Sequence, residues 1–174
     1  MRRLTSWLRF AVVASLPVWL AACSGNTDFS ISKTFHPNAT GGVEYSLTAA
    51  VDMAQDAPAG WKHRDKVKSL ELVEVQGTVT GGSPIPFTGS GTILLRPDGG
   101  TGATDVVAGA WPSETVSGVP HTLGVTLSPA AVGVIETALR GNGKFTVLLE
   151  GTTTASVQFD VDVTLHLKLN YKIP

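Results

Sequence analysis

The clearest hydrophobic pattern in the chain is a strict alternation over residues 157–173. Every odd position in this stretch is apolar or aromatic, and every even position is polar. Because strand side chains point alternately to the two faces of a sheet, this pattern predicts one long strand with a dry face and a wet face. A sheet with one solvated face is typical of antiparallel architectures, so the stretch indicates an all-β domain.

Earlier parts of the chain show the same alternation over shorter lengths. The alternation slips near Leu72 and Val73, which predicts a β-bulge. Residues 129–140 instead carry apolar side chains at helical spacing, after Ser128 as a good N-cap and before Gly141 as a C-terminal cap. Further strands are predicted at residues 29–35, 43–51, 70–80, 87–95, 106–111, 121–127 and 145–149.

The order of these elements predicts the fold class. The chain reads as an all-β protein, a two-layer antiparallel β-sandwich of about eight strands with one short helix near 129–140. The topology is expected to be immunoglobulin-like or jelly-roll-like. With 43% hydrophobic and 16% charged residues in 174, the composition supports one core and argues against disorder.

Charge and cysteine content exclude some functions. After residue 22 the chain carries ten basic and fourteen acidic side chains, so no basic surplus indicates a nucleic-acid partner. A single cysteine, Cys23, excludes an internal disulfide. The four histidines lack metal-ligand spacing, and we expect no metal and no cofactor.

The beginning of the chain has the anatomy of a secretory signal. Arg2, Arg3 and Arg9 form a basic start, and the apolar run over residues 10–20 is shorter than the ~20 residues that span a bilayer. The run closes with Leu20-Ala21-Ala22-Cys23, which resembles the lipobox of bacterial lipoproteins. The resemblance implies that a diacylglyceryl group is added to Cys23, that the signal is cleaved before it, and that the new amino group is acylated.

This resemblance covers only the first 23 residues and predicts three parts. They are a lipoprotein signal peptide over 1–22, a tether over 23–28 and a β-sandwich domain over 29–174. Ser24 follows the cysteine, where an Asp marks inner-membrane retention in enterobacterial lipoproteins. The resemblance therefore implies a lipid-anchored protein of the cell envelope, with the outer membrane favoured and the domain on the periplasmic side or the surface.

The candidate binding residues lie in loops and on one strand face. The run 61–68 has the highest density of charged residues in the chain. It predicts one of two things. The first is a surface that contacts anionic headgroups or a partner, and the second is a solvated loop with Trp61 packed into the core. The candidate binding-loop residues are Trp61, Lys62, Arg64 and Trp111. Asp160 and Asp162, two apart on the polar face of the last strand, are weak candidates for a cation site or serve to keep that face soluble.

Four functions remain open at this point. The sequence favours a lipid-anchored envelope protein with a binding, structural or assembly role. Its partners would be the membrane, through the lipid on Cys23, and an unknown envelope protein or glycan. The alternative is a carrier of an apolar ligand, which needs an enclosed cavity of about 300 Å³ or more. A membrane-inserted β protein and an enzyme are less favoured, and no catalytic residue is expected.

Overall fold

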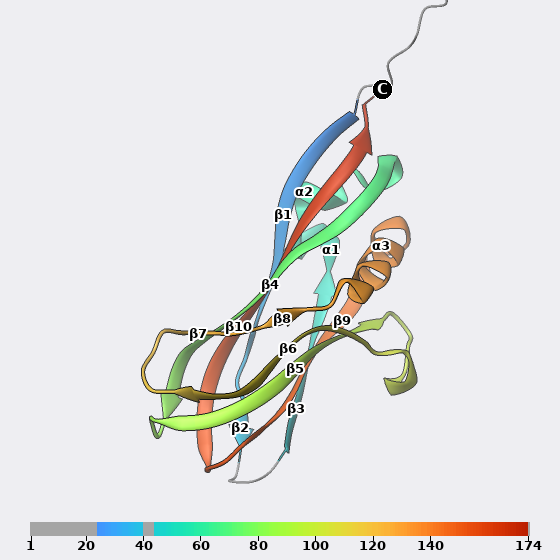
Figure 1. Ribbon diagram of the computed structural model, residues 1–174. Coiled ribbons are helices and arrows are strands. Elements are labelled where there is room, and N and C mark those ends of the chain that lie inside the picture. The colour runs from blue at the N-terminus through green and yellow to red at the C-terminus, as the bar shows by residue number, and fades with distance from the viewer. Residues whose placement is uncertain (1–23, 40–43, 174) are drawn as a thin grey trace, which may run out of the picture.

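The protein folds into two antiparallel sheets that pack face to face (Figure 1). The computed structural model describes residues 24–39 and 44–173. The strands are β1 (Ser24–Phe35), β2 (Asn38–Ala39), β3 (Glu44–Asp52), β4 (Val67–Ser83), β5 (Phe87–Pro97), β6 (Val106–Val116), β7 (His121–Leu123), β8 (Thr126–Leu127), β9 (Lys144–Thr153) and β10 (Val157–Lys172).

The strand order is that of a jelly roll. The first sheet runs β1–β10–β4–β7, with β2 also paired to β10, and the second runs β3–β9–β5–β6–β8. Without the two-residue strands β2 and β8, the eight remaining strands follow the orders 1-8-3-6 and 2-7-4-5, as in a double-sheet jelly roll. The predicted two-layer antiparallel β-sandwich is confirmed, with ten strands where about eight were expected.

Strand β10 lies in the middle of the first sheet and supplies much of the core. It pairs with β1 on one side and with β4 on the other. Its inward side chains are between 0% and 5% exposed, because they lie in the hydrophobic core that the first sheet shares with the second sheet and the helices: Val157, Phe159, Val161, Val163, Leu165, Leu167 and Leu169. The alternation over 157–173 therefore predicted this strand correctly.

A β-bulge interrupts the pairing of β10 with β4. His166 lies opposite Glu74, but Leu167 lies opposite Leu72, so Val73 has no opposite residue. Val73 is 54% exposed, whereas Leu72 is buried. The bulge predicted at Leu72 and Val73 is confirmed, and it keeps the apolar side chains on the core side in both halves of β4.

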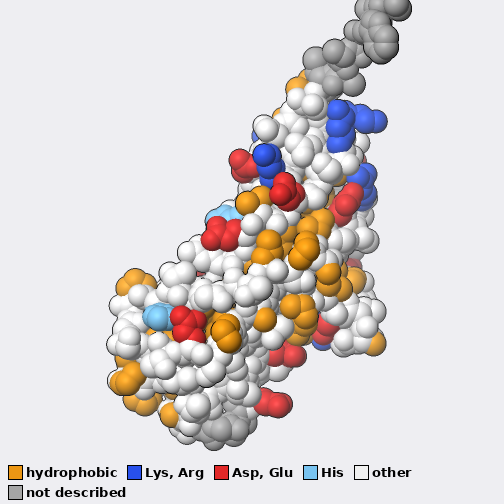
Figure 2. Space-filling model, viewed as in Figure 1, with side chains coloured by type: hydrophobic (Ala, Val, Ile, Leu, Met, Phe, Trp, Pro, Cys, Tyr) orange, Lys and Arg blue, Asp and Glu red, His pale blue; other side chains and the backbone are white. Residues whose placement is uncertain are grey.

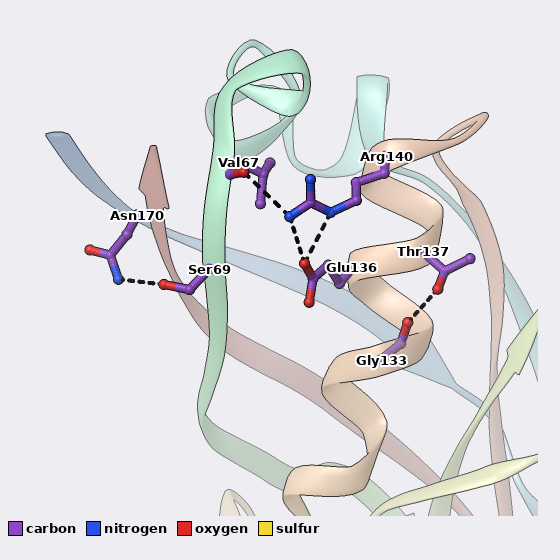
Figure 3. Close-up of polar contacts among 7 residues, drawn as sticks. All are labelled: Val67, Ser69, Gly133, Glu136, Thr137, Arg140 and Asn170. Atoms are coloured by element: carbon purple, nitrogen blue, oxygen red, sulfur yellow. Dashed lines mark hydrogen bonds and ion pairs between the residues drawn. The ribbon is translucent and has the colours of Figure 1, made fainter. Parts of the chain in front are cut away.

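The main helix packs at one end of the sandwich. Helix α3 (Val132–Arg140) follows a 3₁₀ turn at Pro129–Ala131, and Ser128 makes no side-chain capping hydrogen bond. Arg140 Nη2 donates to Glu136 Oε1 at 2.7 Å and to the Val67 carbonyl at 3.3 Å, which joins the helix to the start of β4 (Figure 3). The helix predicted near 129–140 is confirmed.

Short helical elements connect β3 to β4. They are α1 (Met53–Asp56), α2 (Pro58–Trp61) and a 3₁₀ turn at Arg64–Lys66. A further 3₁₀ turn, Gly102–Thr104, lies between β5 and β6. Among the described residues, no helix is long and apolar enough to cross a membrane.

The beginning of the domain differs from the expectation. Residues 24–28, predicted as part of a tether, form the first part of β1 and pair with residues 168–172 of β10. These small polar residues give no hydrophobic signal in the sequence. They are strand because β10 extends alongside them and offers its backbone groups for pairing. The predicted signal peptide and Cys23 lie outside the described residues.

Replacing Leu167 in β10 tests how far the fold depends on this strand. Leu167→Ala removes a side chain that is 1% exposed, so we expect a loss of about 2–5 kcal/mol in the free energy of unfolding, measured by urea denaturation. Val73→Ala, at the exposed bulge, is the control and should change it by less than about 0.5 kcal/mol. Similar losses in the two variants would contradict the packing described here.

Candidate functional site: the basic end of the sandwich

One narrow end of the sandwich brings together three distant parts of the chain. Ser24 pairs with Lys172, and Tyr171 pairs with Val67. The turn at Arg64–Lys66 directly precedes Val67, so it lies at this end as well, at the top of Figure 1. We call this region the basic end and define it by the charged residues Lys62, Arg64, Asp65, Lys66, Lys68 and Lys172.

The basic end is strongly separated in charge from the rest of the domain. It holds five basic side chains and one acidic side chain, a net charge of +4. The rest of residues 24–173 holds five basic and thirteen acidic side chains, a net charge of −8. On the face shown in Figure 2, the Lys and Arg side chains lie mainly toward the narrow end, while Asp and Glu side chains lie both beside them and further along the sandwich. The domain is therefore electrically polarised along its length.

Stacked rings hold the loop of the basic end in place. The guanidinium of Arg64 lies 4.6 Å from the centroid of the Trp61 ring, a cation–π geometry. His63 stacks on Tyr171 of β10, with ring centroids 3.7 Å apart and ring planes at 15°. The loop is thus fixed to the end of β10, although its lysines are exposed.

Trp61 itself packs against the body of the domain. Its ring covers Gly143, where a Cβ atom would lie 2.8 Å from the nearest ring carbon. Gly143 also has a φ of +79°, which favours glycine. Trp61 is half-buried and contacts the core. These observations agree with the interpretation of a solvated loop with Trp61 packed against the core. A contact of this loop with anionic headgroups or a partner stays a prediction.

Electrostatics in the loop reflect its positive charge. Burial lowers the pKa of His63, and the nearby charges of Lys62 and Lys66 lower it further. A second charged group lies in α1, before the loop, where Lys33 Nζ donates a hydrogen bond to Asp56 Oδ2 at 2.8 Å. Burial acts to raise the pKa of Asp56, but the hydrogen bonds from Lys33 and from the Asp52 backbone N–H outweigh it and lower the pKa overall.

The titration of His63 tests this electrostatic description. We expect Lys62→Ala to raise the pKa of His63, because the substitution removes a positive charge that disfavours the imidazolium. An NMR titration of the His63 ring protons measures the shift. Lys144→Ala, which removes an exposed lysine that does not act on His63, should leave the pKa unchanged. An unchanged His63 pKa in the Lys62 variant would contradict the description.

Trp111 does not belong to this site, and its prediction as a binding-loop residue is wrong. The residue lies inside β6 and is 5% exposed. Its ring packs directly over Gly91 of the neighbouring strand β5. The strand was predicted to end at Trp111, but β6 continues through Pro112 and Ser113 to Val116. Trp111 is part of the core.

Substitution of the two tryptophans separates these environments. Trp111→Ala should lower the free energy of unfolding by about 3–5 kcal/mol, as for other buried aromatic side chains, measured by urea denaturation. Trp61→Ala should cost less, because Trp61 is only half-buried. A smaller loss for Trp111→Ala than for Trp61→Ala would contradict the burial of Trp111.

Asp160 and Asp162 lie on the outer face of β10, as the alternation predicted, and each has a neighbour. His36 Nδ1 is 2.7 Å from Asp160 Oδ1, and the Thr34 hydroxyl donates to Asp162 Oδ1 at 2.6 Å. Across residues 24–39 and 44–173, no three His, Cys, Asp or Glu side chains come together in a metal-binding group. A cation site at this pair therefore stays a prediction, without a third ligand.

The space between the sheets is filled by side chains. The apolar pocket beside Trp111, also lined by Tyr45, Phe87 and Phe159, has a volume of about 10 Å³. A single water needs about that much. A hollow of about 510 Å³ beside His36 lies open on the surface instead. The cavity of about 300 Å³ or more that an apolar-ligand carrier needs is not found at this pocket.

Comparisons with known proteins add little to these observations. No family model and no curated protein matches the chain. Similar solved structures include Desmodium yellow mottle tymovirus, 12% identical with a TM-score of 0.31, covering 100% of this chain and 98% of that chain. Turnip yellow mosaic virus is 12% identical with a TM-score of 0.33, covering 84% and 96%. Tobacco necrosis virus is 11% identical with a TM-score of 0.34, covering 86% and 98%. Similarity at this level carries no argument about function.

Proposed function

We propose that the protein is a lipid-anchored β-sandwich of the bacterial cell envelope, with a binding, structural or assembly role and no catalytic one. The position of Ser24 carries this proposal. It directly follows the cysteine of the Leu20-Ala21-Ala22-Cys23 motif and is the first residue of β1, at the basic end. A lipid on Cys23 would therefore be joined to the narrow end of the domain without a tether.

The physics of such an anchor favours firm attachment. Each buried CH₂ group of an acyl chain contributes about 0.8 kcal/mol, so several chains hold a domain where a single myristoyl chain is marginal. The pairing of Ser24 with Lys172 ties the attachment point to β10, the strand on which the first sheet depends. The lipid would thus hold the whole sandwich at the membrane through β10.

This attachment would orient the rest of the domain. The turn after Ser83 lies at the opposite end of β4 from the basic end and would face away from the membrane. Loops at that far end would contact the partner, an envelope protein or a glycan. Ser24 in place of an aspartate favours the outer membrane. The carrier alternative has less support, because the apolar pocket holds only about 10 Å³.

The mass and location of the protein in bacterial cells test the proposal. We expect the wild-type chain to begin at Cys23, to carry the added mass of acyl chains, and to leave the membrane fraction only in detergent. Cys23→Ser should lack the acyl mass. Ser24→Asp is the matched control for sorting and should keep the acyl mass while moving from the outer to the inner membrane on a density gradient. A wild-type chain with an unmodified Cys23 would contradict the proposal.

A further inference from the structure

Most cations of the basic end have no counter-charge within the protein. Across residues 24–39 and 44–173, no ion pair involves Lys62, Lys66, Lys68 or Lys172. At this end only Arg64 has an acidic neighbour, Asp65, at 3.9 Å. Elsewhere in the described residues, Lys33, Arg96 and Arg140 each pair with a carboxylate at 2.8 Å or less, and only the two scattered lysines Lys144 and Lys168 have no ion pair.

We propose that the basic end docks on the anionic phospholipid headgroups of the membrane that carries the anchor. Its exposed lysines come from three segments, namely the loop before β4, the start of β4 and the end of β10. The fold brings these segments together at one end. The orientation rests on the proposed anchor, but the charge contact itself needs no acyl chain.

Charge complementarity favours one orientation. A basic side chain close to an anionic leaflet strengthens binding roughly fivefold, and the attraction falls off within a Debye length of about 8 Å at physiological salt. The rest of the domain, with a net charge of −8, is repelled by the same surface. The domain therefore stands on its basic end with the acidic part held away from the lipid.

Two aromatic residues at the same end fit this contact. Trp61 and Tyr171 are both partly buried there, one beneath Arg64 and the other beneath His63. Trp and Tyr have an apolar ring and a polar group, and both residues are enriched at the level of lipid headgroups.

A bilayer suits this surface better than a nucleic acid does. Residues 24–173 carry a net charge of −4, so a long polyanion that extends past the basic end would meet repulsion. A membrane surface touches the basic end alone, and the proposed anchor keeps that surface within reach.

Footprinting of lysines on vesicles tests the docking. The full-length protein, processed in bacterial cells, is reconstituted into vesicles of phosphatidylcholine or of phosphatidylcholine with phosphatidylglycerol, and it is treated with an amine-acylating reagent. Peptide mass spectrometry then reads each lysine. We expect Lys62, Lys66, Lys68 and Lys172 to react at least threefold less on the anionic vesicles, and we expect high salt to remove this protection. A lysine introduced by Ser83→Lys, at the exposed far end of β4, should react equally on both.

A matched pair of charge-reversal variants tests whether the lysines are protected by docking on the headgroups or only because the anchor holds them near the membrane. Lys66→Glu should restore the reaction of Lys68 and Lys172 on anionic vesicles. Lys144→Glu makes the same change of charge at an exposed residue outside the basic end and should leave the protection intact. Equal labelling of the wild type on both lipids would overturn the docking. Protection of the lysines by a soluble anionic polymer, without protection by anionic vesicles, would also overturn the docking.

The intact mass of the same sample distinguishes the two proposals. An acylated protein that binds both kinds of vesicle without lipid-dependent protection leaves the anchor standing and overturns the docking. An unacylated protein that is protected only on anionic vesicles, in a salt-sensitive manner, supports the docking and overturns the anchor.

Discussion

The two-sided pairing of β10 is the constraint on which the rest of the structure depends. This strand hydrogen-bonds to β1 and β2 on one side and to β4 on the other, whereas β1 and β4 do not pair with each other. Without β10, β1 and β2 would have no partner in the first sheet, and only β4 and β7 would stay paired. The same strand buries seven apolar side chains in the hydrophobic core, so hydrogen bonding and the hydrophobic effect both stabilise the fold through it.

The pairing of β1 with β10 also determines the geometry of the candidate site. Antiparallel strands in continuous register place the start of one beside the end of the other, and here Ser24 lies opposite Lys172. The beginning of β4 reaches the same place because Val67 lies opposite Tyr171. The first sheet thus places the start of β1 next to the basic side chains at the end of β10 and at the start of β4, all at one narrow end of the domain.

Outside this end, the carboxylates are largely held by local donors. Arg96 donates two hydrogen bonds to Asp105, at 2.6 and 2.7 Å, and these lower the pKa of Asp105. The Gly124 backbone N–H and then His121 lower the pKa of Glu114. Both groups therefore contribute stability that is present at neutral pH and is lost as the pH falls through their folded pKa values. In the described part of the chain, the lysines of the basic end have no such ion pair.

The sequence by itself determined the fold class, the long strand β10, the bulge at Val73 and helix α3. Each of these follows from the periodicity of neighbouring residues, which is a local property of the chain. Trp111 was misplaced because its burial depends on Gly91, a residue of another strand. The first residues of β1 were mistaken for a tether because their pairing comes from β10, more than a hundred residues away. Only the tertiary structure decided that Lys62, Lys68 and Lys172 share one end, because register and strand order, rather than local sequence, set which charges become neighbours.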